Sequence, residues 1–272
     1  MQGLPRQNAK RGLVMQALVY TPAMQGIGEF DGGKIIEQKP IGFPGEGAVI
    51  KRVGPLFYWA WATSSAEAMI GLHPHQGFEI ITYVVSGSAF HGDTLGTKST
   101  VGAGGVQVMQ TGSGVSHQEK ISEHAEFFQI WFEPELTEAI RRQPTYHQHE
   151  HKEFPQETNA AGYQVKTIIG SNAPVQLIAN IRMWDVEVSS GAQYKQQVNA
   201  GYTLTALAIR GHGTWADSEE SKPPVHFHHK DFIVAAANAE TEVEIINTDE
   251  GILRLILIEV PTTTSYPLYH KR

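Results

Sequence analysis

The sequence contains no cysteine among its 272 residues. This absence excludes disulfide bonds, thiolate metal ligands and cysteine nucleophiles together. A metal site in this chain would therefore have to be built from nitrogen and oxygen ligands. The absence is also compatible with a cytoplasmic protein, because cytosolic proteins rarely carry structural disulfides.

The sequence is also poor in basic residues and in long apolar runs. Its 21 Lys and Arg residues are outnumbered by 28 Asp and Glu residues, which gives a net charge of −7. Nucleic-acid affinity rests largely on basic side chains that neutralise phosphates, so we expect no direct nucleic-acid contact. No apolar run approaches the roughly 20 residues of a membrane helix, and the N-terminus lacks the apolar core of a signal peptide. We expect a soluble, cytoplasmic monomer without membrane contact.

The sequence does contain a long series of short strand-like runs. These runs are rich in β-branched and aromatic residues and alternate with glycine or polar turns through both halves of the chain. This rhythm predicts an all-β protein built of barrels or sandwiches. Segment 144–160 is polar and contains proline, which predicts a linker between an N-terminal domain at 1–143 and a C-terminal domain at 161–272.

The most informative stretch carries an alternating pair of candidate ligands at each end. His73 and His75 open it, and His117 and Glu119 close it. On a strand, residues two apart point to the same face. Two such pairs on neighbouring strands can aim three imidazoles and one carboxylate at a single point, which is a ligand set for a divalent metal. A lone strand histidine is more often an ordinary core or surface residue, but two paired sets favour a metal site.

The same stretch resembles the two conserved motifs of the cupin superfamily and, within it, the pirin family. The similar segments are HPHQGFE at 73–79, TYVVSG at 82–87, HGDTLG at 91–96 and VQVMQTGSGVSH at 106–117. The resemblance implies two cupin (jelly-roll) barrels in tandem, with a mononuclear metal, usually iron, in the N-terminal barrel. It places the family's four metal ligands on His73, His75, His117 and Glu119. The segment 204–215 resembles a degenerate copy without a preceding His-x-His pair, so the second barrel is expected to have lost its metal motif.

One alternative carboxylate is Glu79. General cupins usually take their carboxylate from the first motif after a four-residue interval, a position that holds Ile80 here. Glu79 is one place out of register, and a slip of one residue turns a strand side chain to the opposite face. We therefore expect Glu79 to be structural and Glu119 to be the ligand.

Three functions remain open at this stage. The resemblance implies an iron dioxygenase that cleaves flavonols such as quercetin with O2, with Glu119 as metal ligand and general base. The ligand set suits Fe(II), with manganese, nickel, cobalt or zinc as substitutes. The alternative is a non-enzymatic, iron-dependent redox-sensing regulator that binds a transcription factor or a metabolic enzyme. A third option is a metal-stabilised barrel whose ligand is unknown. Phe78, Met109, Trp59 and Trp61 are candidates for an apolar pocket wall.

Two further histidine groups have a structural and a metal-binding interpretation. The segment YHQHEH could bind metal adventitiously, but a solvated linker is favoured because no rigid surroundings are evident. The segment PVHFHHKDF could hold a second metal, but exposed or hydrogen-bonded histidines before a strand are favoured. The histidines concerned are His147, His149 and His151 in the first segment and His226, His228 and His229 in the second.

Overall fold

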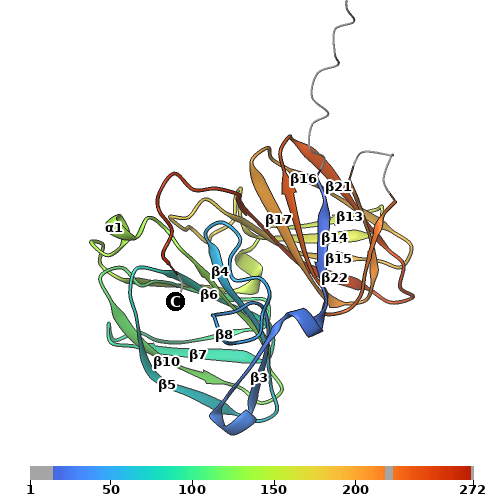
Figure 1. Ribbon diagram of the computed structural model, residues 1–272. Coiled ribbons are helices and arrows are strands. Elements are labelled where there is room, and N and C mark those ends of the chain that lie inside the picture. Colours follow the sequence, from blue (N-terminus) through green and yellow to red (C-terminus); the bar gives the residue numbers. More distant parts are fainter. Residues whose placement is uncertain (1–14, 218–222, 271–272) are drawn as a thin grey trace, which may run out of the picture.

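The computed structural model describes residues 15–217 and 223–270, and it confirms the all-β prediction. Four antiparallel sheets form two halves, each made of a seven-stranded and a four-stranded sheet (Figure 1). The longest helix of the described residues is the four-residue α1 (Leu136–Ala139), and none could cross a membrane. The single-turn 3-10 helices are η1 (Pro22–Met24), η2 (Asp31–Gly33) and η3 (His151–Glu153).

The first half is a sandwich whose two sheets share one core. Apolar side chains from both sheets, among them Ala62, Val84, Val101, Ile121 and Phe127, form a single buried cluster. In order across the larger sheet, the strands are β12 (Thr145–His149), β9 (Val106–Gln110), β6 (Glu79–Ser86), β11 (Glu126–Phe132), β4 (Leu56–Ser64), β3 (Ile35–Ile41) and β2 (Gly26–Phe30). The smaller sheet is β5 (Ala68–His75), β10 (Val115–Ile121), β7 (Ser88–Asp93) and β8 (Lys98–Gly102).

The second half repeats this arrangement around its own core, which includes Val186, Trp215, Phe227, Val243 and Leu255. Its larger sheet runs β1 (Ala17–Tyr20), β20 (Phe232–Ala237), β17 (Tyr202–Arg210), β22 (Leu253–Pro261), β15 (Arg182–Val188), β14 (Tyr163–Ile169) and β13 (Gln156–Asn159). Its smaller sheet is β16 (Gln193–Val198), β21 (Thr241–Asn247), β18 (Gly213–Asp217) and β19 (Val225–Phe227).

A third and larger core joins the two halves. Side chains from the outer faces of the two large sheets pack against each other, including Trp59, Phe128 and Ile130 from the first half and Phe232 and Ile258 from the second. Strands β4, β6 and β11 are therefore buried on both faces. Successive side chains alternate between the interior of the first sandwich and this interface.

The segment expected to be a linker is largely made of edge strands. β12 pairs with β9 in the first half, and β13 pairs with β14 in the second. The N-terminal strand β1 pairs with β20, so the described chain begins in the sheet of the second half and then crosses to the first (Figure 1). The chain therefore crosses between the two large sheets twice, once after β1 and once between β12 and β13.

Candidate metal centre

Strands β5 and β10 bring the predicted histidines together. They pair antiparallel with His73 directly opposite His117 and with His75 opposite Val115. His73 and His75 share one face of β5 because they are two residues apart. The candidate ligand nitrogens of His73, His75 and His117 all lie within 4.8 Å of one another. Among the described residues, this is the one group of three or more such side chains close enough to hold a metal ion.

Hydrogen bonds orient the rings. The Nδ1–H of His73 donates to the carbonyl oxygen of Gly71 at 2.8 Å, which leaves its Nε2 as the free ligand atom. The Nε2 atoms of His75 and His117 are 3.1 Å apart. Burial lowers the pKa of His75 to about 4 and that of His117 to about 2. Both imidazoles are therefore neutral near pH 7, the state in which histidine binds metals.

His91 lies beside His117 and contacts its ring nitrogen. This contact was not predicted from the sequence. His91 Nε2 lies 2.8 Å from the Asp93 carboxylate, and its Nδ1 lies 3.4 Å from Nδ1 of His117. If His91 donates to Asp93, its Nδ1 accepts from His117, and Nε2 of His117 keeps a free lone pair. The ring of His91 also stacks on Tyr146, with centroids 4.1 Å apart. The two-residue spacing of His91 and Asp93 on β7 is the sequence feature from which this contact could have been predicted.

Glu119 lies on the same inward face of β10 as His117 but outside the group of three histidines. A register shift separates the two residues where β10 pairs with β5. The Glu119 carboxylate accepts hydrogen bonds from Gln129 Nε2 at 3.0 and 3.2 Å and from the Thr82 hydroxyl at 3.5 Å. Only 2% of the residue is exposed, and this burial raises its pKa to about 7.

Glu79 is structural, as its register predicted. It projects from the face of β6 opposite to Thr82, toward the second half of the molecule. Its carboxylate accepts hydrogen bonds from the backbone N–H groups of Ile178 at 2.7 Å and Ala179 at 2.9 Å, and from the Gln110 amide at 2.6 Å. This carboxylate fastens the loop before β15 to the first half.

The aromatic wall beside the histidines contains part of the set expected from the sequence, together with Trp131, which was not predicted. Trp131 lies 4.8 Å from His75 between ring centroids, and Phe78 stacks on Trp131 at 6.4 Å. Met109 belongs to a small buried cluster that also packs against Trp131. Trp59 and Trp61 instead project into the core between the two halves, so their assignment to the pocket wall was wrong.

An open hollow on the surface reaches one of the three histidines, His75. It has a volume of about 520 Å³ and lies next to His75. Its other lining residues come from the loops around the ends of β5, β7 and β10, and they are Pro74, Gln76, Thr94, Gly114, Val115 and Ser116. A small molecule in this hollow would therefore lie next to the imidazole of His75.

The other histidines lie in separate environments. His147 and His149 are on β12, where His149 contacts Glu153, and His151 contacts Lys166. His226 is an exposed residue of β19. Of its neighbours in the sequence, His228 lies 3.7 Å from the Asp231 carboxylate, and His229 packs edge-on against Trp61.

Comparisons with known proteins show which family this chain belongs to. The Pirin family model matches residues 57–132, which include all four predicted ligands. Pirin-like protein 2 of Arabidopsis thaliana is 31% identical over 199 residues, covering 67% of this chain and 61% of that relative. A putative pirin-like protein of the same plant is 30% identical, with 68% of both chains covered. The chain spans 61% to 65% of the length of three Arabidopsis relatives.

Two further similarities concern a short segment of an enzyme and the fold of a solved structure. The quercetin 2,3-dioxygenase of Escherichia coli is 43% identical over 68 residues, which are 24% of this chain and 29% of that enzyme. The structure of bacterial pirin YhhW from Escherichia coli, in complex with nickel(II), aligns with a TM-score of 0.71 at 20% identity. That alignment covers 90% of this chain and 99% of YhhW, and it confirms the fold of two tandem cupin barrels. The chain belongs to the pirin family.

Proposed function

We propose that this protein is a metal-dependent dioxygenase that cleaves flavonols such as quercetin with O2 and releases carbon monoxide. The observation that carries the proposal is the convergence of the three imidazoles of His73, His75 and His117 within 4.8 Å of one another, with His75 at the edge of an open hollow. The similarity to a protein named quercetin 2,3-dioxygenase supplies the substrate class.

The donor set fits a divalent metal ion. His73, His75 and His117 would hold the ion through imidazole nitrogens, and Glu119 would add a carboxylate from the next inward position of β10. Three imidazoles and a carboxylate without sulfur suit Fe(II), and they also accept manganese, nickel, cobalt or zinc. The bound ion would supply Lewis-acid binding of the hydroxy-ketone of the substrate and a place for O2 beside it.

Glu119 is the group that would accept the proton of the flavonol 3-hydroxyl. Its pKa of about 7 is suited to this role, because a general base works best when its pKa is near the operating pH. Gln129 donates to both carboxylate oxygens and fixes the plane of the carboxylate. Trp131 and Phe78 would pack against the aromatic rings of the substrate at the side of His75.

The test is a single-turnover experiment. Purified protein is loaded with Fe(II) without oxygen, and quercetin and O2 are then added. We expect the flavonol absorbance to fall while carbon monoxide is released in equal amount. A protein that retains iron but leaves quercetin intact would overturn the dioxygenase proposal and favour the redox-sensing regulator.

Two variants test whether His117 is a metal ligand. His117→Ala should reduce the iron content at least tenfold, because it removes one of three converging imidazoles. His147→Ala is the matched control, since this histidine is exposed on β12 and should leave the iron content unchanged. Equal iron content in the His117→Ala variant and the unaltered protein would refute the ligand assignment.

A further inference from the structure

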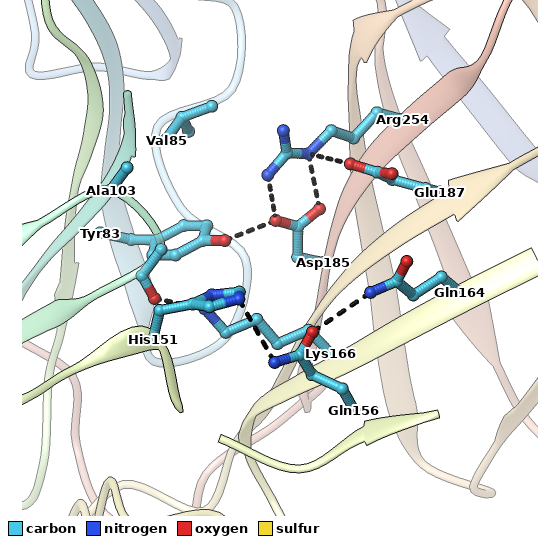
Figure 2. Close-up of a pocket in the computed structure, with 11 residues that line it drawn as sticks. Tyr83, Val85, Ala103, His151, Gln156, Gln164, Lys166, Asp185, Glu187 and Arg254 are labelled. Carbon is cyan, nitrogen blue, oxygen red and sulfur yellow. Dashed lines mark hydrogen bonds and ion pairs between the residues drawn. The ribbon is translucent and has the colours of Figure 1, made fainter. Parts of the chain in front are cut away.

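A second cavity lies between the two halves of the molecule, away from the three histidines. Its volume is about 260 Å³. Figure 2 shows that its polar side chains come from both halves and converge on one space. Tyr83 enters from β6, His151 from η3, Lys166 from β14, Asp185 from β15 and Arg254 from β22.

Lys166 is the unusual member of this cavity. Only 4% of the residue is exposed. Its ammonium group donates to the carbonyl oxygen of Gly104 and to Nδ1 of His151, at 3.1 Å for the latter. Both acceptors are neutral, whereas an ammonium group has three donors and a full charge. In the part of the chain that the structure describes, no carboxylate forms an ion pair with Lys166.

The acidic groups of the cavity are already occupied by other partners. The Asp185 carboxylate accepts from the Tyr83 hydroxyl at 2.5 Å and from Arg254 Nε and Nη2 at 2.9 and 2.6 Å (Figure 2). Glu187 lies 3.4 Å from Arg254 Nε. Both acids therefore contact Arg254, and neither forms an ion pair with Lys166, whose ammonium group lies over the rings of Phe154 and Tyr83 at 4.5 and 5.2 Å. A buried charge without a counterion is costly, so this arrangement favours an external anion.

We infer that this cavity binds a small monocarboxylate anion, which accepts a hydrogen bond from the ammonium group of Lys166. The volume is below the usual range of drug-sized pockets, which favours a ligand of a few carbon atoms. The lining holds two cations, Lys166 and Arg254, and two carboxylates, Asp185 and Glu187, so these acids would repel a dianion more strongly than a monoanion. Two amides at the rim, Gln156 and Gln164, offer further polar contacts, and they are 3.2 Å from each other.

The protonation of Lys166 is compatible with this role. Burial lowers the pKa of its amine to about 8, against the opposing effect of the Asp185 carboxylate. The other titratable or charged groups that line the cavity are Tyr83, His151, Glu187 and Arg254. The amine is therefore mostly charged at pH 7 and mostly neutral at pH 9. The anion should bind about tenfold more weakly at pH 9 than at pH 7.

The experiment is a calorimetric titration of the whole protein with sodium acetate and sodium propionate at constant ionic strength. We expect saturable binding with one site per chain at pH 7, in the metal-free and in the metal-loaded protein alike. Lys166→Met keeps the length of the side chain without the charge, and it should raise the dissociation constant at least tenfold. Lys195→Met is the control, because Lys195 is an exposed lysine paired with Glu242 on the surface.

A second measurement uses the unaltered protein, so its result does not depend on whether the Lys166→Met variant folds. In unaltered protein with 13C-labelled lysine, the Cε resonance of Lys166 reports its titration, and acetate should move the midpoint to higher pH. The Lys166→Met spectrum assigns that resonance. Absence of saturable binding, an unshifted midpoint, or inorganic phosphate binding as tightly as acetate would each overturn the proposal. Iron loading and quercetin cleavage do not enter these readouts, so the result is independent of the proposed function.

Discussion

Glu119 is a buried carboxyl group whose hydrogen-bond partners in the described chain are the neutral side chains of Gln129 and Thr82. A carboxylate in such a place is stabilised far better by a cation than by amides. In metal-free protein the group therefore lowers the stability of the fold whenever it is ionised. This cost would be relieved by a metal ion bound to the carboxylate, as the proposed function requires.

The cost predicts how the stability of metal-free protein depends on pH. Burial raises the pKa of Glu119 from 4.5 to about 7, which corresponds to about 3 kcal/mol. The stabilising contribution is complete below pH 4.5 and is lost as the pH rises through 7, because the native state then binds more protons than the unfolded state. Glu119→Gln stays neutral at every pH. With a chelator present, this variant should melt several degrees above the unaltered protein at pH 8 and at the same temperature at pH 4.5.

The control for this prediction is Glu138→Gln, since Glu138 is an exposed residue of α1. Its melting temperature should follow that of the unaltered protein at both pH values. A Glu119→Gln variant with no pH-dependent advantage would show that Glu119 is not a buried, strained carboxylate. An excess of metal ion should reverse the order at pH 8, because only the carboxylate can serve as a charged ligand.

Strand geometry explains why part of the site could be predicted from the sequence. The shared face of His73 and His75 needed only the two-residue period of a strand, and His117 joins them from β10, whereas Glu119 lies outside this group. The period could not show that Trp59 and Trp61 face the second half while Trp131 faces the histidines. Strands β4 and β11 are buried on both faces, so apolar residues occupy most positions and the sequence pattern does not show which face each side chain is on.

The edge strands were missed for a related reason. Residues 145–149 and 156–159 are mostly polar because each strand lies at the edge of its sheet. Polar composition with proline then looks the same as a solvated linker. Only the pairing of β12 with β9 and of β13 with β14 distinguishes the two. The position of His151 in the cavity between the halves could not be predicted from the sequence for the same reason.

A matched pair of glycines tests how closely the elements pack. Gly54 and Gly32 both have left-handed backbones, with φ of 51° and 64°. A Cβ at Gly54 would lie 2.1 Å from the carbonyl oxygen of Pro261, whereas a Cβ at Gly32 would meet nothing within 4 Å. Gly32→Ala should cost about 1 kcal/mol from backbone strain alone. Gly54→Ala should cost about 2 kcal/mol more, because the turn before β4 must move away from the end of β22.

Urea unfolding of both variants measures this difference. The midpoint of Gly54→Ala should fall well below that of Gly32→Ala with an unchanged slope. Equal midpoints would mean that the turn at Gly54 does not press against Pro261. The two halves would then not be in close contact at Gly54 and Pro261.

The two halves form one molecule through their shared core and several polar ties. Trp59 packs edge-on against Phe232 with ring centroids 5.5 Å apart. Arg210 forms an ion pair with Glu126 across the interface. The C-terminal segment also returns to the first half, where Tyr269 packs against Phe78 near the aromatic wall of the metal centre. Tandem barrels could be predicted from the sequence, but this interface depends on which sheet faces were left apolar after each sandwich had closed.

The extent of this interface predicts that both halves unfold in one transition. Phe232→Ala removes a fully buried ring that contacts the first half, and Phe227→Ala removes a ring buried inside the second half alone. Each change should cost about 3 to 5 kcal/mol. Differential scanning calorimetry of the metal-free protein should show a single endotherm for both variants, lowered by roughly 10 °C. If the halves were independent, Phe227→Ala would leave part of the endotherm at the original temperature. Such a residual peak would also mean that the two halves are not held rigidly together. The cavity around Lys166 would then not keep its shape, because its walls come from both halves.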